Sequence, residues 1–158
     1  MPVEEARQQF EVNLFGLAAI TQIVIPYMRK SNSGTIINTS SMGGKMYTSM
    51  GPWYHASKHA LEGFSDCLRL ELKQFNINVV ILEPGIIVTE FGDVMLKNIS
   101  KFSSKGQYSS LTNKLVTATK KMYDSGQGSK TSVISKTVTK IVNERKPKTR
   151  YRVGLWAK

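Results

Sequence analysis

The sequence predicts a three-layer α/β fold in which helices cover both faces of a parallel sheet. Two observations carry this prediction: helical and strand patterns alternate along the chain, and the strand patterns are short, uniformly apolar runs. Such runs are typical of strands buried on both faces, as they are in parallel sheets. The 158 residues contain no internal repeat and no linker, so we expect one domain over residues 1–158.

Two long helices are predicted in the first half of the chain. Apolar side chains recur with a period near 3.6 over residues 4–30, with acidic residues in the first turn and basic residues in the last. A second helix, over residues 53–74, carries a broad stripe of apolar and small side chains and follows a loop over 43–52.

Short apolar runs at 35–39 and 77–82 predict two buried strands, each bounded by turn residues. Between 88 and 106 the pattern is too weak to indicate an element. The later part of the chain predicts two helices and a closing strand, at 110–123, 131–144 and 151–153.

A doubly wound nucleotide-binding sheet normally opens with a strand, a glycine-rich turn and a helix that binds the pyrophosphate. This sequence begins with a helical pattern, and it contains no G-x-G-x-x-G segment. We therefore expect the fold to be N-terminally truncated, with an earlier part of the domain absent from the sequence.

The net charge of +11 is concentrated in the second half of the chain. Residues 1–90 carry 7 basic and 8 acidic side chains, whereas residues 91–158 carry 15 and 3. The basic residues lie among serines and threonines without a known nucleic-acid-binding motif, so we interpret them as a solvated face and expect no nucleic-acid partner. A surface for an anionic substrate, a membrane or a nucleic acid is the alternative interpretation.

The single cysteine, Cys67, excludes an intrachain disulfide and fits a reducing compartment. The first residues are polar and acidic, unlike a signal peptide. The longest apolar stretch, residues 14–25, is interrupted and too short to span a bilayer. We therefore expect a cytoplasmic protein without a membrane partner.

The candidate chemistry centres on Tyr54 and Lys58, which lie four residues apart on the second predicted helix and therefore on one face. A phenol with its usual pKa of about 10 is a poor acid or base near neutrality, and a nearby ammonium lowers that pKa. Taken alone, this spacing also fits an ordinary surface pair.

Two further polar residues strengthen the pattern. Ser41 follows the strand at 35–39, at the end of the sheet where α/β proteins bind ligands, although a turn cap is the simpler interpretation. Asn13 lies inside the first helix among apolar neighbours, where an amide that satisfies a local carbonyl is the alternative to a functional role.

Together these segments resemble the short-chain dehydrogenase/reductase family over nearly the whole chain. The matching motifs occur in the family's order: VNLFG around Asn13, GTIINTSSMGG around Ser41, YHASK from Tyr54 to Lys58, EPGIIVTEF from Glu83, and RYRVG near the end. The resemblance implies a Rossmann-like, doubly wound sheet and an enzyme that interconverts an alcohol and a carbonyl compound with NAD or NADP.

The resemblance also implies roles for individual residues. Tyr54 would be the acid/base, Lys58 would lower its pKa and bind the nicotinamide ribose, Ser41 would position the substrate carbonyl, and Asn13 would hold a water that links Lys58 to solvent. Further contacts to the cofactor would come from Pro84, Gly85, the Ile87 backbone and the Thr89 hydroxyl.

The expected substrate is a small alcohol or carbonyl compound, enclosed by a lid within residues 86–126. Apolar side chains near the site would line its pocket or serve as ordinary packing: Met42, Met46, Met50, Trp53, Phe91 and Met95. His55 and His59 are spaced as zinc ligands can be, but no third ligand accompanies them, so we expect surface histidines and no metal.

The sequence leaves three kinds of function to distinguish: an intact enzyme, a non-catalytic chain and a nucleic-acid binder. If intact, the enzyme would be a homo-oligomer, a dimer or tetramer. The helices at 4–30 and 53–74 resemble those that pair between subunits in the family, although their apolar stripes could instead face the sheet. A truncated chain that cannot hold cofactor would instead be a non-catalytic fragment or a scaffold subunit. A basic nucleic-acid binder would show association that depends steeply on salt.

Overall fold

The computed structural model describes residues 2–157. The helices and strands follow in the order α1 (Val3–Phe10), α2 (Gly16–Lys30), β1 (Gly34–Thr39), α3 (Pro52–Leu72), β2 (Ile77–Pro84), α4 (Phe91–Ser103), α5 (Ser109–Asp124), α6 (Ser132–Asn143) and β3 (Arg150–Val153). A π-helical turn, Glu11–Phe15, joins α1 to α2 without a break. Every helix and strand predicted from the sequence is confirmed, and α4 is an element that the prediction missed.

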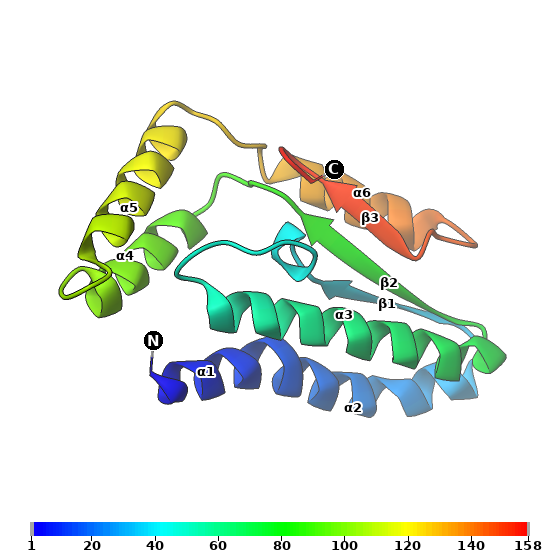
Figure 1. Ribbon diagram of the computed structural model, residues 1–158. Coiled ribbons are helices and arrows are strands. Elements are labelled where there is room, and N and C mark those ends of the chain that lie inside the picture. The colour runs from blue at the N-terminus through cyan, green and yellow to red at the C-terminus, as the bar shows by residue number, and fades with distance from the viewer. Residues whose placement is uncertain (1, 158) are drawn as a thin grey trace.

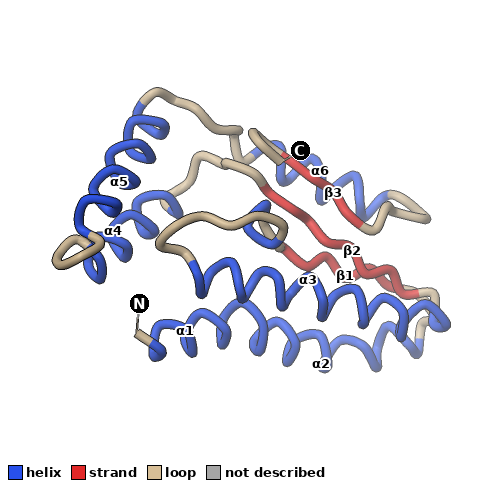
Figure 2. Tube along the Cα trace, in the orientation of Figure 1, coloured by secondary structure: helices blue, strands red, loops and turns tan. Residues whose placement is uncertain are grey.

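The described strands form a parallel sheet in the order β1-β2-β3, as predicted. In its register Ile36 pairs with Val79, and Ile81 pairs with Arg150. The tube in Figure 2 shows α1, α2 and α3 on one side of the strands and α6 on the other, which makes the three expected layers.

The core lies between the sheet and α3. Ile36 and Val79 pack there against Leu68 and Leu72, and Leu72 and Val79 are almost fully buried. Because side chains alternate along a strand, the neighbouring Val80 faces the opposite side, and it is equally buried. This burial on both faces explains why β2 is apolar at consecutive positions.

The continuous helical stretch formed by α1, the π-helical turn and α2 extends well beyond the apolar residues 14–25. From Val3 to Lys30 it is continuous, and by length and composition it meets the requirement for crossing a membrane, so the prediction that this region is too short was wrong on length. That finding is weak evidence for a membrane span, because helices in soluble proteins and signal sequences satisfy the same criteria.

The helix α4 was missed although its apolar positions gather on one side. It packs against α5, and the two form a hairpin at one end of the molecule, within the region predicted as a lid (Figure 1). The contact is close at Gly92, where a Cβ atom would lie 2.6 Å from Cζ of Tyr123.

Not all of the basic second half is a solvated face. Arg150 on β3 donates to Asp66 across 2.7 Å and to Glu62 across 3.2 Å, and its Nε lies 3.2 Å from Glu83. Glu62 and Glu83 are buried, so Arg150 neutralises carboxylates inside the fold and ties β3 to α3 and β2. The expected solvated face is therefore wrong for this residue.

Candidate active site

The candidate site forms at the carboxyl end of β1, where the chain turns into a short 3-10 turn, Met42–Gly44. Ser41 precedes this turn and caps it, because its Oγ accepts a hydrogen bond from the Gly43 N–H across 3.0 Å. The simple interpretation of Ser41 as a turn cap is therefore confirmed. A serine oxygen that accepts in this way still has its own proton to donate elsewhere.

Tyr54 lies in the first turn of α3, close enough to Ser41 for the serine hydroxyl to affect the pKa of the phenol. Its ring contacts Phe91 of α4, with 5.6 Å between ring centroids. Burial raises the pKa of Tyr54 above its ordinary value, the Ser41 hydrogen bond lowers it in part, and Tyr123 raises it further. The phenol is therefore neutral in this structure.

Lys58 follows one helical turn after Tyr54, and its Nζ donates to the Thr39 carbonyl across 2.9 Å, at the end of β1. Burial lowers the pKa of Lys58. Burial is the largest cause of the shift in the Tyr54 pKa, and Lys58 is not among its causes. The three side chains nevertheless converge on one end of the sheet.

Asn13 lies in the π-helical turn and reaches α3 rather than a local carbonyl. Its Nδ2 donates to Ser57 Oγ across 3.0 Å, and that hydroxyl donates in turn to the Tyr54 carbonyl across 2.8 Å. Ser57 is fully buried. Asn13 therefore connects the first helix to the residue that precedes Lys58, and π-helical turns are frequent at functional sites.

The segment after β2 passes the same end of the sheet. At Gly85 a Cβ atom would lie 2.0 Å from the Leu155 carbonyl oxygen, so the glycine that follows Pro84 is required by packing. Ile86 and Val88 make the hydrogen bonds to Ser129, which turns the N–H and C=O of Ile87 to the opposite side. Thr89 Oγ1 accepts from the Phe91 N–H across 3.4 Å, at the start of α4.

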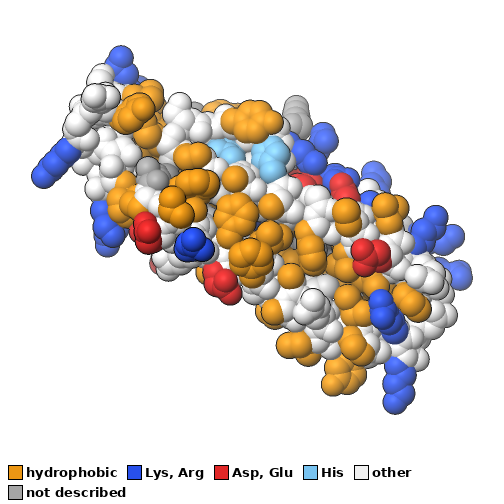
Figure 3. Space-filling view, turned by 60° about the horizontal axis from the view of Figure 1, so that its bottom comes forward, with side chains coloured by type: hydrophobic (Ala, Val, Ile, Leu, Met, Phe, Trp, Pro, Cys, Tyr) orange, Lys and Arg blue, Asp and Glu red, His pale blue; other side chains and the backbone are white. Residues whose placement is uncertain are grey.

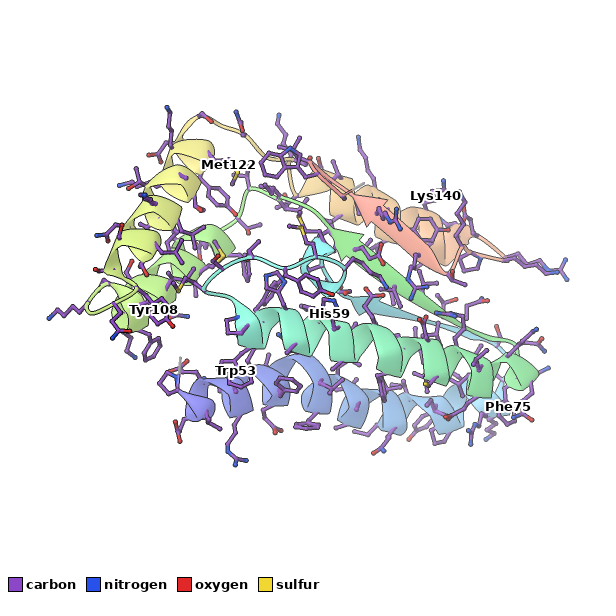
Figure 4. The ribbon with its side chains drawn as sticks, viewed as in Figure 1. Trp53, His59, Phe75, Tyr108, Met122 and Lys140 are labelled. Carbon is purple, nitrogen blue, oxygen red and sulfur yellow. The ribbon has the colours of Figure 1, made fainter. Side chains whose placement is uncertain are left out.

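The expected apolar pocket residues do not form one group. Phe91 lies against Tyr54, whereas Met42 and Met46 line a separate cavity of about 170 Å³ together with Trp156. Figure 4 shows the side chains of α3, where Trp53 and His59 are labelled. It also shows those of the hairpin opposite, where Tyr108 marks the start of α5 and Met122 lies near its end.

Two residues near Tyr54 were not predicted as part of the site. Tyr123 comes from α5 and raises the pKa of Tyr54, and no sequence pattern connects the two. His55 was expected on the surface but is buried, with both ring nitrogens in hydrogen bonds. His59 stacks on Tyr47, with ring centroids 5.2 Å apart. Within residues 2–157 no three His, Cys, Asp or Glu side chains are grouped as metal ligands.

Comparison with known proteins finds one matching family model and several similar dehydrogenases and reductases. The short chain dehydrogenase family model matches residues 1–99. A probable short-chain type dehydrogenase/reductase, VdlC of Helicobacter pylori, is 36% identical over 157 residues, which are 98% of this chain and 55% of that protein. The 3-ketodihydrosphingosine reductase of Bacteroides thetaiotaomicron is 36% identical over 96% of this chain and 55% of its own length.

A solved structure supports the fold. The closed form of serine dehydrogenase complexed with NADP+ matches the whole of this chain with a TM-score of 0.80, at 24% sequence identity and over 58% of its own length. The chain thus spans a little over half the length of these proteins.

Proposed function

The chain belongs to the short chain dehydrogenase family, and on this premise we propose that it is part of an oxidoreductase that interconverts an alcohol and a carbonyl compound with NAD or NADP. The observation that carries the proposal is that Ser41, Tyr54 and Lys58 meet at the carboxyl end of β1. Gly43 donates to Ser41 Oγ and lies against the Tyr54 ring, and Lys58, one helical turn after Tyr54, donates to the Thr39 carbonyl. We propose that residues 1–158 form one catalytic and substrate-binding unit.

In the proposed reaction Tyr54 is the acid/base. A neutral phenol at neutral pH, as burial favours here, donates its proton to an alkoxide as a carbonyl is reduced. In the reverse direction the phenolate removes the proton of an alcohol. Ser41, whose oxygen accepts from Gly43, would turn its proton from the Tyr54 oxygen to the substrate oxygen and so orient that oxygen toward the phenol.

Lys58 and Asn13 support the phenol in this proposal. The Lys58 ammonium would lower the Tyr54 pKa once it leaves the Thr39 carbonyl to bind the ribose of the cofactor. Asn13 holds the segment of α3 between Tyr54 and Lys58 through Ser57. In the proposed reaction the Asn13 side chain would also hold a water that links Lys58 to solvent.

The described residues fit the nicotinamide end of such a cofactor, which supplies or accepts the hydride when bound. Ile87 directs its backbone N–H and C=O away from Ser129, as a contact to a carboxamide requires, and the Thr89 hydroxyl is exposed beside it. Pro84 and Gly85 shape this turn. The sequence has no glycine-rich phosphate loop, so the proposed contacts are limited to that end.

The proposed substrate is a small molecule bound between Tyr54 and the hairpin of α4 and α5. Phe91 presents an apolar surface to the phenol, and Tyr123 adds a second phenol from α5. The relative from Bacteroides thetaiotaomicron is named for a lipid ketone, 3-ketodihydrosphingosine. An apolar ketone is therefore the first substrate class to test.

We further propose a homo-oligomer, a dimer or tetramer, in the cytoplasm. Hydrophobic side chains gather along the outer face of the helix layer in Figure 3. The large exposed ones on α2, α3 and the π-helical turn are Val12, Phe15, Ile20, Ile23, Tyr27 and Leu70. An exposed apolar face of this extent favours association.

Titration of the purified chain with NADH and NADPH, followed by fluorescence, tests the proposal together with turnover of a ketone panel. Saturable binding and turnover that is lost in Tyr54→Phe are expected. The matched control is Tyr47→Phe, because Tyr47 is an exposed tyrosine on the loop that precedes α3. Absence of saturable binding would support the alternative of a non-catalytic subunit.

A further inference from the structure

We propose that His55 is a positioning residue for the reaction, which orients the Ser41 hydroxyl through Gly43. The inference rests on the proposed function, because it explains how Ser41 is held toward Tyr54. The His55 imidazole is only 8% exposed. The loop of residues 43–51, which joins Ser41 to Tyr54, packs over the imidazole. His55 forms hydrogen bonds with this loop at Gly43 and at Thr48.

The hydrogen bonds determine the protonation state of the imidazole. The Thr48 backbone N–H, which can only donate, lies 3.0 Å from Nε2, so Nε2 must accept and carries no proton. The Gly43 carbonyl, which can only accept, lies 2.8 Å from Nδ1, so Nδ1 carries the proton. The ring is therefore neutral, with its proton on Nδ1.

Gly43 connects His55 to Ser41 because its backbone forms hydrogen bonds with both side chains. While its carbonyl accepts from His55, its N–H donates to Ser41 Oγ across 3.0 Å. The residue is wedged between two rings, because a Cβ atom there would lie 2.9 Å from Tyr54 Cε1 and 3.1 Å from His55 Nδ1. A shift of the Gly43 carbonyl would therefore move the Ser41 hydroxyl relative to the Tyr54 ring.

His55 also contacts Thr48, farther along the loop, and the Tyr54 ring. Thr48 Oγ1 lies 2.8 Å from Nε2, in addition to the Thr48 backbone N–H. The ring meets Tyr54 edge-on, with centroids 5.7 Å apart and planes at 72°. One buried side chain therefore contacts the loop at Gly43 and at Thr48 as well as the tyrosine ring, and in this role it does not touch the substrate.

Nitrogen NMR of the unmodified chain tests the proposal without any activity measurement. At neutral pH we expect a proton on Nδ1 and none on Nε2, and a scalar coupling across the hydrogen bond between the Thr48 amide nitrogen and Nε2. An imidazole protonated on Nε2, or one averaging between both forms, would overturn the proposal.

Three variants test the consequence for the reaction. His55→Asn keeps an N–H for Gly43 and should retain turnover within about tenfold, whereas His55→Leu should lower kcat about 10- to 100-fold with NADH affinity unchanged. The control, His59→Asn, alters the other histidine of the same helix and should behave as the unmodified chain. Normal kcat in a folded His55→Leu variant would overturn the proposal.

Failure of the proposed function can be told apart from failure of this inference. If the unmodified chain neither binds cofactor nor turns over a ketone, the proposed function fails, and the NMR result still decides the role of His55 in holding Gly43. If His55→Leu does not fold, the comparison rests on His55→Asn and on the Nδ1 proton of the unmodified chain.

Discussion

The Asn13 side-chain amide donates to the Ser57 hydroxyl across 3.0 Å and so joins the π-helical turn to the helix that carries Tyr54 and Lys58. Ser57 is completely buried and passes the connection to the Tyr54 carbonyl. The position of the candidate acid/base therefore depends on a residue more than forty positions away in the chain.

Replacing Asn13 with alanine should lower the free energy of unfolding by about 1 kcal/mol, because the hydrogen bond to Ser57 is lost. Chemical denaturation measures this change. The control, Gln8→Ala, alters an exposed amide on α1 and should change the free energy by less than about 0.5 kcal/mol. Equal effects of the two substitutions would show that the contact contributes nothing.

Tyr54 should ionise only above the range in which an exposed tyrosine does. Because burial raises its pKa above the ordinary value, the phenolate absorbance assigned to it should be missing up to about pH 10. The measurement is the ultraviolet difference between the unmodified chain and Tyr54→Phe during a pH titration. Phenolate from this residue near pH 8 in the absence of cofactor would contradict the neutral phenol described above.

The ion pairs of Asp66 should make stability sensitive to acid. Burial raises the pKa of Asp66, but the hydrogen bonds and charges of Arg150 and Arg69 outweigh it and leave the pKa below its ordinary value. A carboxyl whose folded pKa is lowered stabilises the fold above its unfolded pKa of about 3.9, and this stabilisation is lost as the pH falls through the folded value.

Asp66→Asn should therefore lower the free energy of unfolding at pH 7 by at most about 1 kcal/mol, since the carboxylate is partly exposed. The difference from the unmodified chain should shrink below pH 4 and vanish once Asp66 is protonated in the folded state. Thermal unfolding between pH 3 and 7 measures it, with Asp124→Asn as the exposed control. A difference that stays constant down to pH 3 would count against these ion pairs.

Glycine at position 85 is required by contact with the chain itself. The Cβ atom of an alanine there would lie 2.0 Å from the Leu155 carbonyl oxygen, so Gly85→Ala should destabilise the fold by about 1–3 kcal/mol. Gly63→Ala is the matched control, because no atom lies within 4 Å of that Cβ position and alanine favours a helix interior by about 1 kcal/mol. Opposite changes in the melting temperature are expected, and a neutral Gly85→Ala would refute the clash.

Much of the fold was predictable because it depends on local pattern. Apolar runs mark β1 and β2, and a 3.6-residue period marks α2 and α3, since a side chain must face the core to be buried. The helix α4 was not predicted although its apolar positions also gather on one side, which packs against α5 at the end of the molecule. No pattern within its own residues shows which other helix will cover its apolar side.

The sequence by itself determined the family motifs, the order of the elements and the presence of Ser41, Tyr54 and Lys58 on segments that a parallel sheet brings to one end. Only the tertiary structure decided what each side chain contacts. Asn13 bonds to Ser57, Lys58 to the Thr39 carbonyl, and His55 is a buried link rather than a surface residue. Hydrogen-bond partners and burial depend on distances between segments remote in the chain, and spacing along a sequence does not contain those distances.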